Sequence, residues 1–434
     1  MPYRSSLCLM GSLVRDGVIS PLELVDAHLL QIAQRNPEIN AFVEIFDEAA
    51  REEARELERR ERHGLLYGVP VTVKDSFDVA GHATRCGCPD RPDTPAARDA
   101  AAVARLRGAG AVILGRTNTS ELLRDYECAN PITGRTNNPW NLERTPGGSS
   151  GGEAAAIASC CSAGGIGSDG GGSIRIPAHF CGIAGLKPTP GRVPGTGHFP
   201  RLGFPVGMVT TVGPMARTVE DLRLLFSVLA AYDPEDPFSV PVPLRAPRLD
   251  AWPIAVWERF YDVPVHEDVA QALSAASAML GAQGFQVECF EPQGFERAPN
   301  LWAFLFSQWT NSPDAFTAAD VLARLAERDS LRTAFLQAME GLAAIAMPVC
   351  GVAAFRHGER RIPAGGREIG AFQMAMPALI ANVFGLPALT LPVAVTAEGL
   401  PVGVQLLGRP FEDEMLLEIG IRLEEARGLW NPPA

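Results

Sequence analysis

The apolar positions near the N-terminus repeat with the period of an α-helix. They fall three or four residues apart, at Leu22, Val25, Leu29 and Ile32. Ser20 and Glu23 form a capping box, and Pro21 occupies the first helical position. Asn36-Pro37 is expected to end this helix. The first 60 residues are therefore predicted to be helical.

The hydrophobic period changes to two after Leu66. Val69, Val71 and Val73 alternate with other residues and lead into Lys74, which is expected at or just beyond the end of a strand. A helical stretch follows at 100–106. Further apolar runs predict strands at Ala111–Leu114, Trp252–Val256 and Leu386–Val395. This alternation of strand and helix patterns favours an α/β fold whose sheet is covered by helices on both faces.

Charge and composition exclude several classes of protein. The chain of 434 residues is 47% hydrophobic and 20% charged, with a formal net charge of −12, which argues against a nucleic-acid or anionic-membrane surface. The alternating charges at 51–62 predict a solvated helix face rather than a partner surface. No apolar run approaches the length of a membrane span, and the N-terminal residues lack the apolar core of a signal peptide. A cytoplasmic protein is expected.

Lysine is rare in this chain. Of the 38 basic residues only Lys74 and Lys187 are lysines, and all others are arginines. Because a lysine can be deprotonated and an arginine cannot, each lysine is informative. The nine cysteines have no metal-ligand spacing, so buried free thiols and no metal site are expected.

Residues 145–189 carry two serines flanked by glycines. Ser149 lies in Gly147-Gly148-Ser149-Ser150-Gly151-Gly152, Ser173 follows Gly170-Gly171-Gly172, and 153–163 between them is predicted to be an alanine-rich helix. Without a Cβ, backbone N–H groups converge more easily on one point, and a substrate carbonyl can approach closely. The segment therefore predicts a serine nucleophile beside an oxyanion hole.

Three other interpretations of these glycines remain open at this point. A phosphate-binding loop would end in Gly-Lys-Ser/Thr, and no lysine is present there. The pattern Gly147-x-Ser149-x-Gly151 matches the nucleophile elbow of α/β-hydrolases, which requires a strand running into the serine and a late histidine. Residues 137–146 look like a loop instead, and His266 and His357 have no supporting context. A purely structural glycine loop is the third alternative.

Residues 145–189 resemble the signature of the amidase signature family. After the paired glycines and serines come Asp-x-Gly-Gly-Ser-Ile-Arg-x-Pro-Ala and then Phe-Cys-Gly-x-x-Gly-Leu-Lys-Pro-Thr. The segments 68–75, 212–221 and 399–408 also match, in the same order. The resemblance extends from about residue 22 to residue 417.

This resemblance implies a role for each reactive residue. Ser173 is the nucleophile, Ser149 is a bridging serine preceded by a cis peptide bond, and Lys74 is the base. A buried lysine has a lowered pKa, so neutral Lys74 can take a proton from Ser149, which takes one from Ser173. The oxyanion hole is formed by the backbone of four residues, Gly170, Gly171, Gly172 and Ser173. Neither a metal nor an organic cofactor is required.

The neighbouring residues are given structural roles. Asp169 and Arg175 are expected to pair and to fix the loop around Ser173, with a substrate contact as the alternative. Lys187 is expected to be structural, in a turn-like Gly-Leu-Lys-Pro, and Cys181 to be packed rather than reactive.

The resemblance also implies one domain with a central mixed sheet over residues 1–434. It comprises an N-terminal helical arm at 1–60, a catalytic signature core at 64–225, and the remaining sheet and substrate-pocket region at 250–434. The proline-rich stretch at 234–247 is either a boundary or a long surface connection. Homodimers occur in the family, so a homodimer is an open alternative.

The sequence says less about the substrate. The segments 301–309 and 372–376 are apolar and either line an acyl or aryl pocket or pack in the core. The turn at 197–200 resembles that of family members acting on apolar amides. The region 308–353 is short for the family, which predicts a reduced lid and an open site.

We therefore expect a serine hydrolase that cleaves C–N acyl bonds of small apolar or aryl amides, including anilides, carbamates (urethanes) and some esters. No nucleic-acid or membrane partner is expected. The alternatives are the catalytic subunit of a tRNA-dependent amidotransferase, an α/β-hydrolase-type esterase, and a homologue without activity that only binds. The lysine-rich helical segment expected of the amidotransferase subunit is absent from the sequence.

Overall fold

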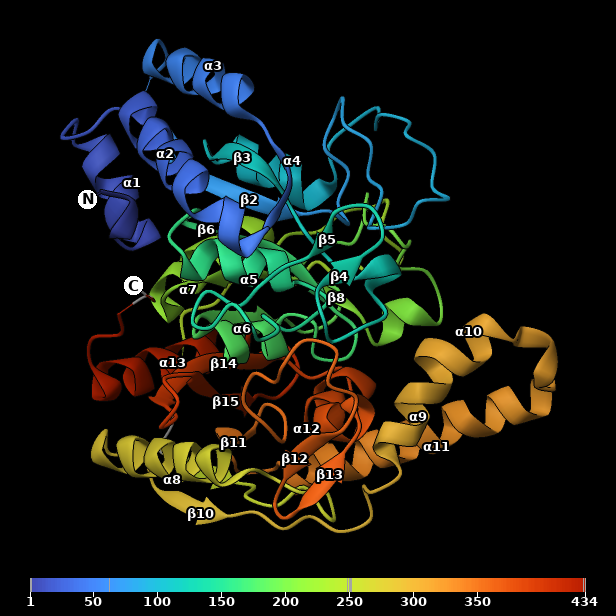
Figure 1. The fold of residues 1–434 in the computed structure, drawn as a ribbon. Helices are drawn as coiled ribbons and strands as arrows, with labels where there is room; N and C mark the ends of the chain where they lie inside the picture. Colours follow the sequence, from blue (N-terminus) through green and yellow to red (C-terminus); the bar gives the residue numbers. More distant parts are fainter. Residues whose placement is uncertain (1, 62, 248, 250–251, 432, 434) are drawn as a thin grey trace.

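A computed structural model describes residues 2–61, 63–247, 249, 252–431 and 433. An eleven-stranded mixed sheet runs through the molecule in the order β1-β3-β2-β6-β8-β7-β14-β15-β11-β9-β10 (Figure 1). Its strands are β1 (Phe42–Ile45), β2 (Pro70–Lys74), β3 (Val112–Thr117), β6 (Gly164–Asp169), β7 (Ala184–Lys187), β8 (Thr211–Ala216), β9 (Ile254–Val256), β10 (Val287–Cys289), β11 (Ala344–Pro348), β14 (Ala388–Val395) and β15 (Pro401–Leu407). Two short hairpins lie outside it, β4 (Ala129–Asn130) with β5 (Gly134–Arg135) and β12 (Ile362–Ala364) with β13 (Arg367–Ile369).

Helices cover both faces of the sheet, as the strand and helix pattern predicted. The helices are α1 (Leu7–Arg15), α2 (Pro21–Ile39), α3 (Asp47–Glu58), α4 (Ala101–Gly108), α5 (Gly151–Ala158), α6 (Arg175–Cys181), α7 (Val219–Leu229), α8 (Glu267–Ala282), α9 (Ala298–Ala303), α10 (Trp309–Asn311), α11 (Ala318–Ala338), α12 (Ala371–Val383) and α13 (Asp413–Arg427). A π-helical turn at Phe304–Gln308 joins α9 to α10. Helices α5 and α6 pack side by side on one face, and α7, α8 and α13 pack on the other. None of the described helices is long and apolar enough to cross a membrane.

The first long helix, α2, begins as predicted and ends later. The capping box of Ser20 and Glu23 is present. The prediction that Asn36-Pro37 ends the helix was wrong, because α2 continues to Ile39 with Pro37 inside its last turn. The helix ends at Asn40, whose φ of 48° is left-handed, while the Asn36 side chain accepts hydrogen bonds from the amides beyond it. A proline this close to the end interrupts few helical hydrogen bonds, so its cost is small.

The helical interpretation of residues 1–60 missed β1. This strand has only four residues, too few to show a clear period, and it pairs antiparallel with β3 at the edge of the sheet. The charged run that follows forms α3, whose Arg51 makes ion pairs with Asp47 and Glu48 on the solvent side. Arg62, the last residue of that run, lies outside the described residues.

Two boundaries around the glycine-rich segment differ from the prediction. The helix expected at 153–163 is α5, which begins at Gly151 and ends at Ala158, since Cys160 adopts a φ of 58° that no helix continues. Lys187 was expected in a turn, but it is the last residue of β7 and is fully buried.

The predicted strand at 69–74 is β2, all of whose residues are buried. The other three predicted strands are present as β3, β9 and β14. The proline-rich stretch at 234–247 has no regular secondary structure, and the strands before and after it belong to the same sheet.

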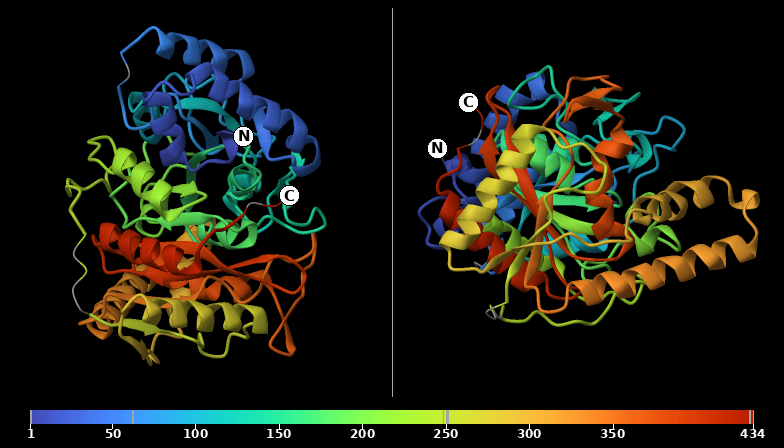
Figure 2. Two further views of the ribbon diagram at one scale, coloured as in Figure 1. Left: turned by 90° about the vertical axis from the view of Figure 1, so that its left-hand side faces the viewer. Right: turned by 90° about the horizontal axis from the view of Figure 1, so that it is seen from below.

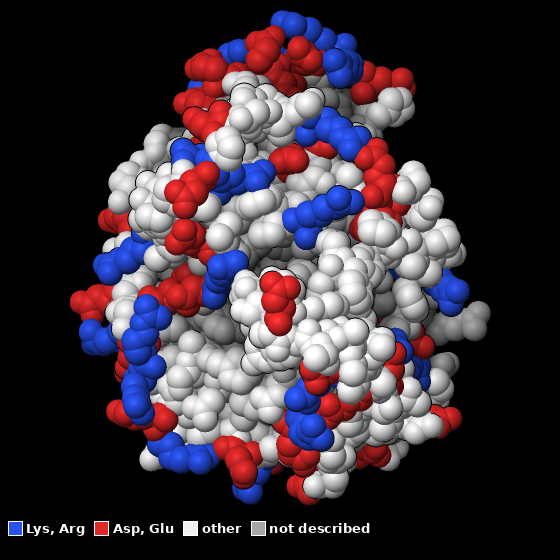
Figure 3. Space-filling model, turned by 90° about the vertical axis from the view of Figure 1, so that its right-hand side faces the viewer, with Lys and Arg blue, Asp and Glu red and all other residues white. Residues whose placement is uncertain are grey.

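A helical hairpin built from α10 and α11 projects from the body of the molecule (Figure 2). Arg328 and Arg332 anchor α11 to the body, because they donate hydrogen bonds to the backbone carbonyls of Val383 and Phe384 at the end of α12. Figure 3 views the molecule from the side on which this hairpin projects. Acidic and basic side chains are interspersed over that face of the molecule, most densely over α3 at the top.

Candidate active site

The reactive residues gather where two parallel strands end. Strands β2 and β6 are parallel neighbours in the sheet, so their carboxyl ends meet at one edge. Lys74 is the last residue of β2, and Ser168 lies one residue before the end of β6. The glycine-rich loop after β6 contains Ser173 and leads into α6, which begins at Arg175.

Lys74 is fully buried and binds two serine hydroxyls. Its Nζ lies 2.7 Å from Oγ of Ser149 and 3.2 Å from Oγ of Ser168. Burial lowers the pKa of Lys74 to about 8, although Asp169 and Glu153, among other nearby groups, oppose this shift. About a tenth of this lysine is therefore neutral at pH 7, and about half at pH 8, and the neutral form can accept a proton.

Ser149 is held immediately before α5. The peptide bond between Gly148 and Ser149 is cis, as the family resemblance implies. The Ser149 carbonyl oxygen accepts a hydrogen bond of 2.8 Å from Oγ1 of Thr119. A Cβ at Gly148 would lie 2.4 Å from the carbonyl oxygen of Asp125, so only glycine allows this close approach.

Ser173 and Ser149 line one small cavity of about 50 Å³. Ser173 is partly exposed, whereas the residues on either side of it are buried. Its hydroxyl forms no hydrogen bond to another residue that the structure describes, and its carbonyl oxygen accepts from the amide of Ser150 at 3.2 Å. The structure thus brings the three sequence-predicted residues together, with the Ser173 hydroxyl free to meet a substrate.

The four backbone amides predicted for the oxyanion hole differ in their availability. The amide of Gly172 already donates to Oδ1 of Asp169 at 2.8 Å. No acceptor for the amides of Gly170, Gly171 and Ser173 is present among the described residues. These three, rather than all four, can therefore receive a substrate oxygen.

Two aromatic side chains orient the glycine loop through its carbonyls. Nε1 of Trp302 donates to the Gly170 oxygen, and the Tyr126 hydroxyl donates to the Gly171 oxygen at 2.8 Å. The Gly170 carbonyl and the Gly171 N–H belong to one trans peptide unit, in which the two groups point in opposite directions. Because Trp302 binds the carbonyl, the Gly171 N–H points away from Trp302. A Cβ at Gly171 would lie 2.5 Å from Cζ2 of Trp302, which explains the glycine there.

Asp169 and Arg175 form the predicted pair. Both nitrogen–oxygen distances are 2.9 Å, and both side chains are fully buried. Burial opposes ionisation of Asp169, but Arg175 and Asn382 outweigh it and lower the pKa of this carboxyl. Arg175 also donates to Gln405 at 2.8 Å, so the pair anchors the loop to the C-terminal half of the sheet.

Sequence reasoning missed several residues of this site. Ser168, Thr119 and Tyr126 were not singled out, although Ser168 lies within the predicted segment and Lys74 binds it directly. Its place near the end of a strand was the available signal. Nothing local in the sequence marks Thr119 or Tyr126, because their contacts are with residues far along the chain.

The prediction of a reduced lid and an open site stays a prediction. The cavity beside Ser173 is small and is bordered by Leu202, Val206 and Phe306. Phe306 comes from the predicted apolar segment 301–309, and Trp302 of the same segment stacks on it at 4.8 Å. Met374 of the other candidate segment is fully buried in α12. Part of the 301–309 segment therefore lines the cavity, whereas Met374 packs in the core.

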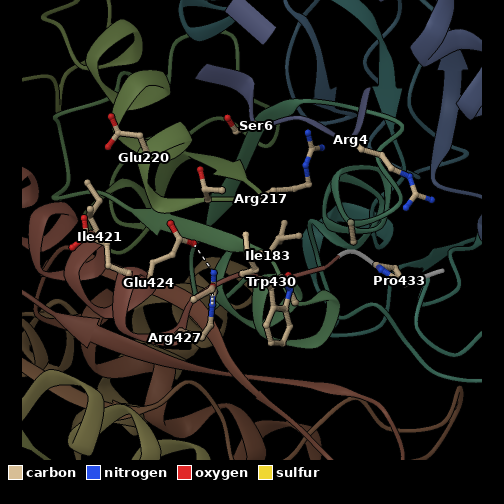
Figure 4. Close-up of a pocket in the computed structure, with 16 residues that line it drawn as sticks. Arg4, Ser6, Ile183, Arg217, Glu220, Ile421, Glu424, Arg427, Trp430 and Pro433 are labelled. Atoms are coloured by element: carbon tan, nitrogen blue, oxygen red, sulfur yellow. Dashed lines mark hydrogen bonds and ion pairs between the residues drawn. The ribbon is translucent and has the colours of Figure 1, made fainter. Parts of the chain in front are cut away.

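A larger cavity of about 710 Å³ lies elsewhere, between the two ends of the chain (Figure 4). Its Arg427 pairs with Glu424 at 3.2 Å, and its Arg217 donates to the carbonyl oxygen of Ser162 at 2.8 Å. None of the serines bound to Lys74 lines it. Size alone therefore does not mark the candidate site, because Ser149, Ser168 and Ser173 line the small cavity.

The thiols and the other side chains that could bind a metal do not cluster among the residues that the structure describes. All nine cysteines are free, and Cys289 is exposed, contrary to the expectation that the thiols are buried. Among the described residues, no group of three or more His, Cys, Asp or Glu side chains could hold a metal ion. Cys181 is fully buried with its sulfur 3.4 Å from the Pro146 oxygen, in agreement with a packing role.

The nucleophile-elbow alternative lacks its structural context. Residues 136–150 form no strand leading into Ser149. His266 caps α8 and His357 lies beside Glu127. Neither histidine lines the cavity that holds the two serines.

Comparison with known proteins identifies the family. A family model described as Amidase matches residues 23–309 and 299–417. The chain belongs to the amidase family. This amidase is accordingly an enzyme that hydrolyses carbon–nitrogen bonds, as are related members of the family.

Relatives and solved structures of several activities resemble this amidase along almost its whole length. A glutamyl-tRNA(Gln) amidotransferase subunit from Roseiflexus castenholzii is 33% identical over 96% of this chain and 95% of its own. Indoleacetamide hydrolase of Bradyrhizobium diazoefficiens is 31% identical over 96% of this chain and 85% of its own. A bacterial aryl acylamidase of the amidase signature family is 26% identical, with a TM-score of 0.86 over 98% of this chain and 96% of its own. The fold class predicted from the sequence is thereby confirmed.

Proposed function

We propose that this amidase is a serine hydrolase that cleaves C–N acyl bonds of small apolar or aryl amides through an acyl-enzyme on Ser173. The observation that carries the proposal is the hydrogen bond of 2.7 Å between buried Lys74 and Ser149, in a site where Ser149 and Ser173 share one cavity. A lysine with a pKa near 8 that touches a serine, beside a second serine with a free hydroxyl, is an arrangement that activates a nucleophile.

The proton path follows from these contacts. Neutral Lys74 takes the proton of the Ser149 hydroxyl, and Ser149 takes the proton of Ser173 as that oxygen attacks the substrate carbonyl. Ser149 then returns a proton to the leaving amine, which departs and leaves an ester on Ser173. A water molecule repeats the sequence on this ester and releases the acid.

The oxyanion of the tetrahedral intermediate is stabilised by the free amides of the glycine loop. Gly170, Gly171 and Ser173 provide these amides, while the Gly172 amide holds Asp169 and thereby fixes the loop. One such donor typically lowers the activation free energy by about 3 kcal/mol.

The residues that line the cavity favour substrates with apolar groups. Leu122, Leu123, Leu202, Val206 and Phe306 border it, so the groups beside the scissile bond meet aliphatic and aromatic surface. Indoleacetamide hydrolase and aryl acylamidase are among the similar proteins, which supports aryl amides and anilides as the substrate class. Aryl carbamates and esters present the same carbonyl to Ser173 and belong to the proposal.

A second candidate is the catalytic subunit of a tRNA-dependent amidotransferase. The 33% identity to a glutamyl-tRNA(Gln) amidotransferase subunit favours it. In that case the enzyme would release ammonia from glutamine and would work with partner subunits. The apolar walls of the cavity argue for the first candidate, since a glutamine side chain is polar.

The test compares purified wild type, Ser173→Ala and Ser149→Ala on p-nitroacetanilide, a p-nitrophenyl carbamate and glutamine. Both variants should lose hydrolysis of the anilide and the carbamate by at least about 1000-fold. Ser150→Ala is the matched control, since it removes a neighbouring hydroxyl that does not touch Lys74, and it should retain most of the activity. Unchanged activity of Ser173→Ala would refute the nucleophile. Ammonia from glutamine, with no hydrolysis of the aryl substrates, would establish the second candidate instead.

A further inference from the structure

The cavity beside Ser173 contains a buried polar atom without a partner. Nε2 of His198 is buried and makes no hydrogen bond within the described part of the chain. His198 lines the same cavity as Ser149 and Ser173 and is only 5% exposed. A buried polar atom without a partner carries a substantial free-energy cost, so such an atom in a residue that lines a reactive site calls for a ligand.

The other ring nitrogen determines what Nε2 can bind. Nδ1 of His198 lies 2.8 Å from the carbonyl oxygen of Pro200. A carbonyl oxygen can only accept, so Nδ1 must carry the proton, and the neutral ring then leaves Nε2 without one. Burial lowers the pKa of His198 to about 3, and the nearby Lys74 acts in the same direction, which agrees with a neutral ring. Nε2 is thus an acceptor that requires a donor.

The surrounding contacts hold the ring in this orientation. Phe77 packs against it edge to face with 5.0 Å between ring centroids, and the backbones of Phe77 and His198 form an antiparallel bridge. The next amide, that of Phe199, donates to the Ser76 oxygen at 2.7 Å. These contacts therefore hold the ring in one orientation, with Nε2 as its unpartnered acceptor.

We propose that Nε2 of His198 accepts a hydrogen bond from the N–H of the scissile amide or carbamate and so makes this residue specificity-determining. This inference rests on the proposed function, with Ser173 as the nucleophile. The cavity of about 50 Å³ has little more room than one or two water molecules occupy, so a donor that reaches Nε2 belongs to the group bonded to the reacting carbonyl. Primary and secondary amides, anilides and N–H carbamates provide this donor. Tertiary amides and esters leave Nε2 unsatisfied.

The test measures kcat/KM for a matched pair, p-nitroacetanilide and p-nitrophenyl acetate, which differ only in N–H against O. His198→Phe keeps an aromatic ring against Phe77 but removes the acceptor. It should lower kcat/KM for the anilide by about 10- to 100-fold, while the value for the ester changes by less than about threefold. His198→Gln restores an acceptor oxygen and should recover part of the preference for the anilide. Thr211→Val is the matched control, because it removes an unpartnered buried oxygen of a residue that does not line the cavity, and it should leave the anilide-to-ester ratio near that of wild type.

Equal losses on the anilide and the ester would overturn the proposal, since they indicate that His198 only supports the fold of the loop. A lower kcat on both substrates with kcat/KM unchanged would also overturn it, because His198 would then act on the water of deacylation. If His198→Phe does not fold, wild type alone provides the test, because it should hydrolyse N-methyl-p-nitroacetanilide at least about 10-fold less efficiently than p-nitroacetanilide. Equal rates on these two would refute the inference. Failure of the proposed function would be seen separately, as activity that persists in Ser173→Ala.

Discussion

At the scale of single residues, the environment of Lys74 decides the chemistry. The two carboxylates that act on it electrostatically are both bound by other groups. Glu153 accepts hydrogen bonds from Thr72 and Thr117, and Asp169 is paired with Arg175. Lys74 forms no ion pair among the described residues, and its contacts are the hydroxyls of two serines. Burial without a bound counter-charge therefore explains its lowered pKa.

The pH dependence of hydrolysis should report this lysine. A base must be unprotonated to act, so kcat/KM should rise with pH and level off above about 8, the pKa of Lys74. Glu153→Gln should move this rise to lower pH, because the Glu153 carboxylate acts to raise the pKa of Lys74. Stopped assays of anilide hydrolysis between pH 5 and pH 10 check both outcomes. A rise that Glu153→Gln moves to higher pH would contradict the assignment.

Burying Lys74 should also cost stability. Its folded-state pKa of about 8 lies below the ordinary 10.5, so the unfolded chain binds the proton more tightly at neutral pH. Lys74→Met should therefore raise the free energy of unfolding at pH 7 by an amount of the order of 3 kcal/mol. This gain should disappear as the pH rises from about 8 towards 10.5. Denaturant unfolding at several pH values measures it.

Lys187 provides the matched control for that experiment. It is the other buried lysine, its pKa is lowered to about 7 by burial, and among the described residues its Nζ donates only to the Pro188 oxygen. Lys187→Met should also be more stable than wild type but should keep hydrolysis, whereas Lys74→Met should lose it. Loss of activity in both variants would show that neither lysine is specific to the chemistry.

At the scale of elements, a helix from the C-terminal half supports the glycine loop. Trp302 on α9 donates to the Gly170 oxygen, and its ring covers Gly171. Trp302 also stacks on Phe306, which borders the cavity. Helix α9 therefore orients the loop amides, and the π-helical turn that follows it contributes to the wall of the substrate site.

Trp302→Phe should separate these two contributions. The variant keeps a ring over Gly171 but removes the donor that orients the Gly170–Gly171 peptide. We expect kcat to fall about 10-fold or more while KM changes little, since the amides act mainly on the transition state. Trp309→Phe, the same substitution in the following helix, should leave kcat near wild type. A rise in KM alone would show that Trp302 only shapes the pocket.

At the scale of the whole molecule, Arg175 connects the two halves of the sheet. Its guanidinium binds Asp169 at the end of β6, and it donates to the Ala378 oxygen in α12 and to Gln405 in β15. All these groups are fully buried. The loop that holds Ser173 is thus fixed by residues more than 200 positions further along the chain.

Arg175→Met should therefore destabilise the whole fold. It leaves Asp169 buried without its cation, which typically costs about 3 to 5 kcal/mol. Arg98→Met, which removes an exposed ion pair with Glu235, should leave the stability nearly unchanged. Chemical unfolding followed by circular dichroism compares the two variants with wild type. Equal stabilities would contradict the anchoring role of Arg175.

Much of the fold could be predicted from the sequence because its signals are local. The capping box at Ser20, the alternation that leads into Lys74 and the glycines around Ser173 act over a few residues, and the structure has an element at each place. Where the prediction was wrong, the competing signal was weak or distant. Strand β1 is too short to show a period, and α2 continues past Pro37 because a proline in the last turn costs little.

The sequence by itself determined which side chains are present at the site and the order in which strands and helices follow one another. Only the tertiary structure decided how those side chains behave. Lys74 meets Ser149 from 75 residues away, and Trp302 meets Gly170 from 132 residues away. The lowered pKa of Lys74, the occupied amide of Gly172 and the small cavity all arise from such contacts. They depend on burial and on distances between segments, and neither quantity exists until the chain has folded.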